Sequence, residues 1–434
     1  MGIRLSRAVV KSIILVGAGF LFFLSFFSCS KSLEEQSVIE ESSVNLETDF
    51  LLPITKDSIL IDTHGNMYFD YIPKLDREQY LSNKLFLMGY NGLNMSVIDT
   101  IGKFTRHITR SGNGPGEIPI GNYASVWQST DGGIYVLSSG NAFMLYVFDK
   151  YANYRYTLKL FQALPNIFRA PRTSFHFTEK EEDGKFYLTI AVGSTLHSEF
   201  TKAYYENTDV LARFEINEYQ QKIVSAKTFM PYENFPEVKE SLKEGKIFWF
   251  NLYPMFHTVG NKTYLTFSFS NSVYVLNENF KIEERIKSKV LSEVEKIKNG
   301  SDFLPRTPMQ NYDRVYYRNK NAFSNLYITN LQVMDDLVMV QFAKPSEEKD
   351  FLPKFPTRQQ ANEDRRNYEG FIHERDQYWL IYNLKSGKEE LIKLPTEYKN
   401  GIFLDKRRMI VEKKFDDLEG FYLMKYTLTN PIGQ

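Results

Sequence analysis

From about residue 50 onwards, short apolar runs alternate with turn residues, a pattern that predicts β-strands rather than helices. Several runs share one repeat, in which an apolar strand is followed by Asp or Asn, a few turn residues and a second strand. Asp and Asn suit that position because their side chains bond to backbone N–H groups two residues further on. The copies begin with Met95–Asp99, Leu145–Asp149, Arg213–Asn217, Val273–Asn277, Leu380–Asn383 and Leu423–Tyr426.

Each copy is preceded by another run with strand character. These runs are Lys84–Met88, Gly133–Ser138, Lys185–Val192, Thr263–Ser268, Leu337–Phe342 and Arg408–Lys413. Strand, strand, turn and strand recurring as a unit predicts an all-β fold, a β-propeller built of small antiparallel sheets. Six copies predict six blades. A seven-bladed ring is the alternative, and a pair of β-sandwiches fits the repeat less well.

The chain is long enough for this fold and for insertions. Six blades of about 40–45 residues need roughly 260 residues, which leaves on the order of 120 of residues 50–434 for inserts. Residues 344–376 are dense in charge and carry three prolines, which indicates an exposed excursion. Residues 287–299 have apolar positions at helical spacing and predict one short amphipathic helix. Residues 231–245 indicate an irregular or partly helical insert.

The ring also has to be closed, because an open ring exposes strand edges with unpaired backbone groups. The last copy of the repeat ends near Thr429 and is one strand short, whereas the segment Ser58–Phe69 offers strands without a blade around them. We therefore predict that an N-terminal strand completes the last blade. If that segment formed a blade of its own, the ring would have seven.

Residues 1–28 have the features of a secretory signal peptide. They carry Arg4, Arg7 and Lys11, no acidic residue, and an apolar run from Ile13 to Phe27. The single cysteine, Cys29, follows at the expected cleavage point. The stretch Phe26–Cys29 resembles a bacterial lipobox, although Phe26 and Phe27 depart from its usual residues. A buried free thiol is the alternative for an isolated cysteine.

The lipobox resemblance implies a lipoprotein in which Cys29 carries fatty-acyl chains such as palmitate, and several chains on one residue hold a protein firmly to a membrane. The polar, acidic stretch 29–49 then acts as a flexible tether, and residues 50–434 form the propeller domain. We expect a cell-envelope location, at the outer membrane, with the domain facing the periplasm or the cell surface.

Composition restricts the other possibilities. The 434 residues include 53 basic and 53 acidic side chains, so bulk charge gives no reason to expect a nucleic-acid partner. One cysteine excludes a disulfide framework and a cysteine-rich metal site. Phe and Tyr are abundant, at 35 and 28 residues, and flat rings suit the space between packed sheets.

A glycine-rich segment lies between the first two copies of the repeat. The segment Arg110–Glu117 has the sequence Arg-Ser-Gly-Asn-Gly-Pro-Gly-Glu. It resembles the Gly-Pro-Gly-Glu turn of six-bladed propeller lipoproteins of the Bacteroidota, and size, lipobox and repeat resemble one uncharacterised branch of that group, a domain of unknown function. The resemblance implies fold and lipidation but no activity. By itself, the turn is either a nest of backbone N–H groups for an anion or a tight connection that needs positive φ.

Local catalytic and metal motifs are absent from the sequence. It contains no Gly-x-Ser-x-Gly elbow and no His-Glu-x-x-His, so we expect no cofactor and no metal. The residues of a propeller site come from different blades, and a pair of carboxylates of glycosidase type remains open. His257, just after Tyr253-Pro-Met-Phe, is a candidate for a residue that faces the central channel, with turn capping as the alternative.

Two clusters of basic and ring-bearing residues are the other candidates for ligand binding. Arginine with an aromatic ring suits an anionic or sugar-like ligand, and packing on a strand face is the alternative. The candidates are Arg106 and Arg110 in one cluster, and Arg314, Tyr317 and Arg318 in the other.

The sequence therefore favours a membrane-tethered, non-enzymatic propeller that binds a ligand, a glycan or an envelope protein on one face of its ring. The competing hypothesis is a hydrolase or lyase acting on carbohydrate, with its site in the axial channel. It requires several ionisable side chains with shifted pKa values to converge there. A purely structural partner in an envelope complex is the third possibility.

Overall fold

The computed structural model places strands along the predicted propeller region, from Thr55–Leu60 to Tyr422–Thr427. It describes residues 55–60, 74–75, 84–88, 94–99, 104–110, 112–119, 124–140, 142–169, 174–178, 180–197, 201–243, 254–268, 270–296, 326–345, 375–394, 398–413, 422–428 and 431–432. All of them belong to one unit, Leu46–Gln434. The predicted signal peptide and tether, with Cys29, lie outside the described residues.

The described strands form six four-stranded antiparallel sheets and one two-stranded sheet. The first two sheets are β2 (Lys74–Leu75), β3 (Lys84–Met88), β4 (Asn94–Asp99) and β5 (Phe104–Thr109), then β6 (Ala124–Gln128), β7 (Ile134–Ser138), β8 (Leu145–Phe148) and β9 (Tyr154–Leu158). The next two are β11 (Phe175–Phe177), β12 (Lys185–Ala191), β14 (Asp209–Asn217) and β15 (Lys222–Pro231), then β16 (Pro254–Val259), β17 (Lys262–Phe267), β18 (Ser272–Leu276) and β19 (Ile282–Lys287).

The last two sheets differ in how they are completed. One consists of β20 (Tyr327–Met334), β21 (Leu337–Ala343), β22 (Gln377–Asn383) and β23 (Glu389–Leu394). The other contains β24 (Tyr398–Phe403), β25 (Arg408–Lys413), β26 (Tyr422–Thr427) and, from the opposite end of the chain, β1 (Thr55–Leu60). Strand β1 pairs antiparallel with β26 from Thr55 opposite Thr427 to Leu60 opposite Tyr422.

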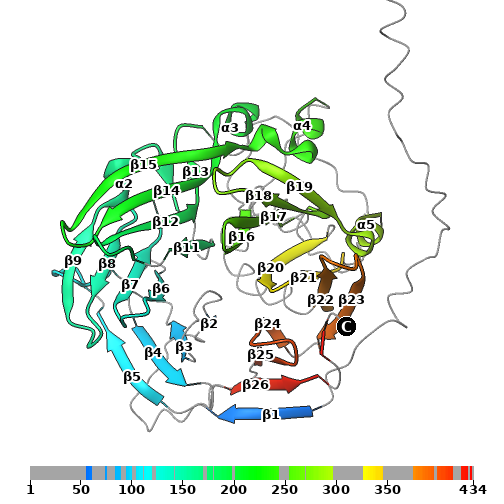
Figure 1. Ribbon diagram of the computed structural model, residues 1–434, viewed down its shortest axis with the longest axis horizontal. Coiled ribbons are helices and arrows are strands. Elements are labelled where there is room, and N and C mark those ends of the chain that lie inside the picture. The colour runs from blue at the N-terminus through cyan, green and yellow to red at the C-terminus, as the bar shows by residue number, and fades with distance from the viewer. Residues whose placement is uncertain are drawn as a thin grey trace, which may run out of the picture. The chain divides into compact units, whose positions relative to one another are not determined.

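The repeat inferred from the sequence is confirmed strand by strand. Its six copies supply the third strand of each sheet, β4, β8, β14, β18, β22 and β26, and the six preceding runs supply the second strand. First strands lie towards a common centre and fourth strands outside (Figure 1). Contacts link β3 to β6, β11 to β16, β16 to β20 and β20 to β24. The fold is therefore all-β and propeller-like, with sheets that follow one another around this centre.

The Asp and Asn of the repeat do what their position predicts. Asp149 Oδ1 accepts the N–H groups of Tyr151 and Asn153, both at 2.8 Å. Asn277 and Asn383 accept two backbone N–H groups each in the same way. These bonds close the turn and compensate for its left-handed backbone. The positive-φ residues are Ala152 (65°), Phe280 (56°) and Gly387 (69°) in these three turns, and Gln221 (50°) in the matching turn after Asn217.

The core lies between the sheets. Strands β7, β8, β18 and β21 are buried at every position, because a neighbouring sheet covers each of their faces. Strand β19, on the outside, is exposed at all but one position. Rings fill the space between sheets as predicted, with Trp127 of β6 stacked on Phe177 of β11 at 4.7 Å between centroids.

Polar side chains join the first strands of neighbouring sheets. Gln332 of β20 donates to the carbonyl of Phe403 at 2.7 Å and accepts its N–H at 2.9 Å, so one side chain pairs with β24 as a strand would. Asn330 donates to the carbonyl of Gly401 at 2.9 Å. On the other side of β20, the N–H of Val333 donates to Nδ1 of His257 at 2.7 Å.

Short helices lie in the connections. They are α2 (Leu160–Ala163), α3 (Lys202–Asn207), η2 (Tyr232–Asn234), α4 (Pro236–Lys243) and α5 (Lys289–Lys296), and a two-stranded sheet joins β10 (Ile167–Phe168) to β13 (Gly193–Ser194). Helix α5 confirms the helix predicted for 287–299, and η2 with α4 confirms the partly helical insert at 231–245. Most of the predicted excursion 344–376 lies outside the described residues.

Candidate functional site

The structure assigns His257 to a joint between sheets. Its Nδ1 accepts the Val333 N–H, so the neutral ring carries its proton on Nε2. Burial lowers the pKa of His257 to about 4, which keeps the imidazole neutral at physiological pH. Its structural use is therefore to hold β16 against β20.

The two predicted candidates that lie in the described residues, Arg106 and Arg110, are in another part of the fold. Arg106 lies in β5 opposite Val97, and Arg110 follows that strand and accepts the N–H of Ile118 on its carbonyl at 2.7 Å. Both belong to a different sheet from His257. The second cluster, Arg314, Tyr317 and Arg318, lies outside the part of the chain that the structure describes.

The glycine-rich turn is wrapped around its own glutamate. The N–H of Gly114 donates to Oε2 of Glu117 at 2.7 Å, and the N–H of Glu117 donates back to the carbonyl of Gly114 at 3.0 Å. A carboxylate of the chain thus occupies the place that an external anion would take in a nest. Gly116 has φ +77°, and a Cβ there would lie 2.5 Å from the ring of Tyr154. The geometry is that of a tight connection.

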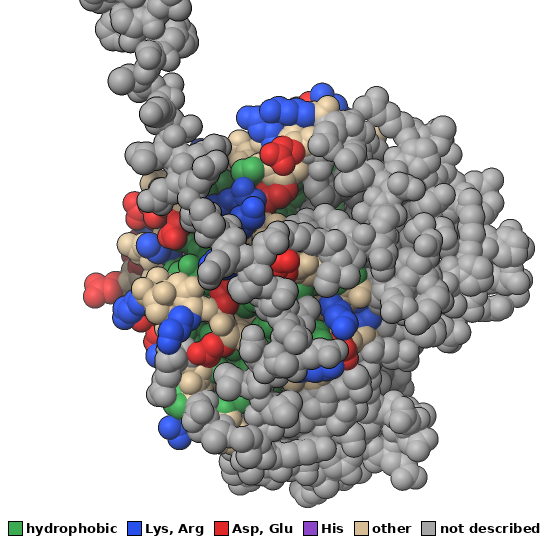
Figure 2. Space-filling model, turned by 90° about the vertical axis from the view of Figure 1, so that its right-hand side faces the viewer, with side chains coloured by type: hydrophobic (Ala, Val, Ile, Leu, Met, Phe, Trp, Pro, Cys, Tyr) green, Lys and Arg blue, Asp and Glu red, His purple; other side chains and the backbone are tan. Residues whose placement is uncertain are grey.

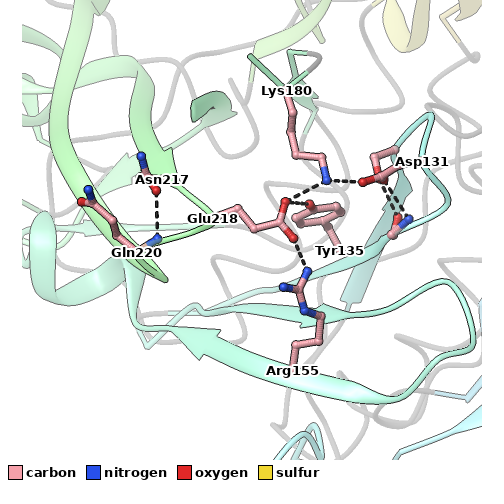
Figure 3. A network of polar contacts seen from close by, with 9 residues as sticks. Asp131, Tyr135, Arg155, Lys180, Asn217, Glu218 and Gln220 are labelled. Atoms are coloured by element: carbon pink, nitrogen blue, oxygen red, sulfur yellow. Dashed lines mark hydrogen bonds and ion pairs between the residues drawn. The ribbon is translucent and has the colours of Figure 1, made fainter. Parts of the chain in front are cut away.

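A network of charged groups joins the second sheet, β6–β9, to the third, β11–β15 (Figure 3). At its centre is Glu218, which directly follows β14 and is only 3% exposed. Its carboxylate accepts the hydroxyl of Tyr135 at 2.9 Å and the ammonium of Lys180 at 2.8 Å, and it pairs with the guanidinium of Arg155. Lys180 also pairs with Asp131, which accepts the N–H of Gly133 at 3.1 Å.

The turns that carry this network lie at one end of the two sheets. In a four-stranded antiparallel sheet the first and the third turn point the same way, so Asp131, Lys180 and Glu218 come to the same end. We call it the hairpin-turn end, made of the turns 129–133, 149–153, 180–184 and 217–222. The Arg155–Glu218 pair links the turns of neighbouring sheets.

Three groups of this network, Asp131, Lys180 and Tyr135, keep one protonation state over a wide pH range. Burial would raise the pKa of Asp131, but hydrogen bonds from Lys180, Ser129 and Gly133 outweigh it and lower that pKa to about 2. Burial would lower the pKa of Lys180, but Asp131 and Glu218 raise it. Burial, with Glu218, raises the pKa of Tyr135. None of these three groups exchanges a proton near pH 7, so they suit fixed positioning of charge better than acid–base catalysis.

Two tyrosines project from the same end. Tyr151 is 67% exposed and Tyr219 is 71% exposed, on the outer turns of the two sheets that the network joins. Their backbones are fixed, because Asp149 binds the N–H of Tyr151 and because Glu218, just before Tyr219, is anchored by its carboxylate. The Tyr219 ring lies over Gly184 and Lys150 lies 5.1 Å from the Tyr151 centroid. Two exposed rings thus lie on turns at the same end of the sheets as the charged network.

Sequence reasoning missed this cluster. The repeat places Asn217 and its turn correctly, but a glutamate in such a turn is expected in solvent. Its partners come from Tyr135, Arg155 and Lys180, in other strands and turns. The only signal in the sequence was the run of a turn Asn followed by Glu and Tyr. Only the tertiary structure shows which residues contact this glutamate.

The described surface carries both signs of charge on the side of the molecule that is on the right in Figure 1. On that face, drawn in Figure 2, acidic and basic side chains of the described residues are interspersed, in line with 53 residues of each kind in the chain. Among the residues that the structure describes, no three metal-ligating side chains gather as a metal site. No helix in that same part of the chain is long and apolar enough to cross a membrane.

Comparisons with known proteins support the fold. No protein-family model matches the chain, and no curated protein matches it significantly. A solved structure from Bacteroides vulgatus, of the DUF4221 family, is similar with a TM-score of 0.53 at 10% identity, covering 86% of this chain and 96% of that one. A solved structure of a protein from Bacteroides fragilis, whose name describes it as an exported protein, has a TM-score of 0.45 at 12% identity. The match covers 87% of this chain and 95% of that one. At such identities the first similarity shows the fold alone.

The glycine-rich turn leads to a prediction on stability. Gly116→Ala places a Cβ on a left-handed backbone and against the ring of Tyr154. It should lower the free energy of unfolding by about 2–4 kcal/mol. Gly140 has φ +97°, but a Cβ there would meet no described residue within 4 Å, so Gly140→Ala is the matched control and should cost about 1 kcal/mol. Urea unfolding measures both. Equal losses would contradict the assigned packing.

The network leads to a prediction on pH dependence. The folded pKa of Asp131, about 2, lies below its ordinary value of 3.8, so its stabilising contribution is present above that value and is lost as pH falls towards 2. Lys180→Met removes the partner responsible. The free energy of unfolding should fall near pH 6, and its decline between about pH 4 and pH 2 should become shallower than in the wild type.

The matched control for this substitution is Lys385→Met, which removes an exposed pair with Asp336. It should leave the acid limb of the stability profile unchanged, because exposed pairs contribute little. Parallel acid limbs for the wild type and Lys180→Met would refute the assignment.

Proposed function

We propose that this protein is a six-bladed β-propeller lipoprotein of the bacterial cell envelope that binds a partner protein at its hairpin-turn end. Six four-stranded sheets, with a strand from the N-terminal side completing the last one, support the six-bladed ring. The lipobox resemblance at Cys29 supports the anchor. The ring would hold one end of its sheets towards the partner while the tether leads to the membrane.

The observation that carries the binding role is the pair of exposed tyrosines beside the locked network. Tyrosine is enriched in protein interfaces because it offers a large, rigid contact area at a small cost in side-chain entropy. Tyr151 and Tyr219 have most of their surface in solvent, although their backbones are held in place. Arg155 and Asp131, each partly exposed, supply hydrogen-bonding groups of both signs at the same end of the two sheets.

The chemistry of the described polar groups favours binding over turnover. His257 and the amides of Asn330 and Gln332 serve the joints between first strands, and the charges around Glu218 are fixed near neutral pH. A carbohydrate-active enzyme would need an acid and a base that differ in proton affinity and face one reaction centre. A carbohydrate-active enzyme is therefore the second candidate function, after partner binding.

The binding role predicts a loss on removal of the two rings. Full-length protein in detergent should retain an envelope protein from membrane extracts, and the double variant Tyr151→Ala/Tyr219→Ala should bind that protein at least about tenfold more weakly. The matched control is Val224→Ala/Ile282→Ala, which removes two exposed apolar side chains on outer strands. It should bind as the wild type does.

A second arm of the same experiment separates ligand classes. The same three proteins are applied to a glycan array. Glycan binding that depends on both tyrosines would replace the protein partner with a saccharide. Equal retention of every partner by wild type and the tyrosine variant would reject the hairpin-turn end as the binding surface.

The anchor predicts a separate result. Cells given an alkyne analogue of palmitate should label the wild-type protein in the membrane fraction, whereas Cys29→Ser should lose the label and leave that fraction. Ser28→Ala, which keeps the cysteine and a small residue before it, is the control and should retain both. A labelled or membrane-bound Cys29→Ser would contradict lipidation at this residue.

A further inference from the structure

A half-buried arginine lies between the third and fourth sheets. Arg213 is in β14, directly opposite Thr189 of β12, which in turn lies opposite His176 of β11. Residues opposite one another across a sheet share a face. This face packs against the sheet β16–β19, as contacts of Arg213 with Glu278 and Phe280 show.

Arg213 is bound by a hydroxyl and a carbonyl rather than by a carboxylate. Nε donates to Oγ1 of Thr189 and Nη1 donates to the carbonyl of Glu278, both at 3.3 Å. In the part of the chain that is described, no carboxylate lies within ion-pair distance of it. By contrast, three other arginines each pair with a carboxylate, and they are Arg155 with Glu218, Arg285 with Glu237 and Arg408 with Asp405.

An aromatic ring lies against this guanidinium. The ring centroid of Phe280 lies 4.3 Å from Cζ of Arg213, a cation–π contact. Phe280 has φ +56°, at the turn position where the other sheets carry Ala152, Gln221 or Gly387, and a bulky residue in left-handed backbone is strained. Nε and Nη1 of Arg213 are bound by Thr189 and Glu278, and Nη2 makes no hydrogen bond to any described residue.

A second donor lies on the same face. The ring of His176 makes no hydrogen bond within the described residues, and it is partly exposed. Burial, followed by the charges of His257 and Arg213, lowers its pKa to about 4, so at neutral pH it is an uncharged imidazole with one N–H. It offers a donor without adding a charge.

The acidic groups nearby do not neutralise Arg213. Glu215, two residues further along β14, accepts the hydroxyl of Ser225 at 2.8 Å. Burial, the largest effect, lowers the pKa of Arg213, while Tyr187 and Glu278 raise it through space without outweighing burial. Half-buried charges in proteins usually have a partner of opposite sign. Here that partner is missing from the described residues.

We infer that Arg213 and His176 form a binding site for an oxyanion, the carboxylate, phosphate or sulfate group of a small ligand that lies between the two sheets. A guanidinium that lies against a ring and is open on one edge binds such groups through forked hydrogen bonds. The histidine N–H supplies a third donor. This site is separate from the hairpin-turn surface, so its test does not depend on the proposed function.

The experiment titrates the full-length protein in detergent with sodium acetate, phosphate, sulfate and glucuronate, with glucose as the neutral probe, at pH 7. Binding is followed by calorimetry and by the Cε1–H resonance of His176. Wild type should bind at least one oxyanion saturably and shift that resonance, and glucose should do neither. Acetate and glucuronate against phosphate and sulfate distinguish the carboxylate from the tetrahedral source.

Substitutions then assign the site. Arg213→Gln should weaken binding at least about tenfold, and Arg213→Lys, which keeps the charge but not the fork, should fall between the two. Arg408→Gln, whose carboxylate partner is internal, is the control and should bind as wild type does. Thermal unfolding of each variant shows that it is folded. Absence of saturable binding to the wild type, an unmoved His176 resonance, or equal binding by Arg213→Gln would each overturn the site.

Discussion

The structure depends on how the inner edges of its sheets are satisfied. A strand at the edge of a sheet carries N–H and C=O groups that need partners. Here side chains of a neighbouring sheet supply several of them, with Gln332 pairing both backbone groups of Phe403 and His257 accepting from Val333. Each such bond fixes how closely two sheets approach. The apolar faces of the sheets then form the buried core, and the turns at the sheet ends lie where their side chains meet.

Much of the fold was readable because its signals are local. An apolar run followed by Asp or Asn predicts a hairpin from chemistry within a few residues, as at Asp149 and Asn277, and the repeat of that signal gave the propeller-like arrangement. The side-chain bonds between sheets could not be predicted from the sequence, because nothing in a strand glutamine indicates a backbone partner 71 residues away. For the same reason the sequence left His257 as a candidate for a channel-facing residue or for a turn cap, and only the structure shows its bond to the neighbouring strand.

The candidate site shows the same limit from the side of function. Glu218 stands where a solvated turn residue is expected, yet it is buried because Tyr135, Arg155 and Lys180 converge on it from elsewhere in the chain. The groups paired in this network already have their partners within the protein, so ligand binding falls to side chains with exposed surface. These side chains, the two tyrosine rings and the open edge of Arg213, lie in different parts of the sheets, so one scaffold can serve two kinds of ligand.

The joints also bear on how such a ring can change during evolution. They are made by an imidazole at one boundary and by carboxamides at the next, each matched to a backbone position on one particular neighbour. The four-stranded sheets, each one sector of the ring, look alike in their strands but are therefore not interchangeable. Deleting, duplicating or shuffling one of them would bring together boundaries that do not match. Variation should accumulate in the loops between sectors, while the number and order of the sectors stay constant.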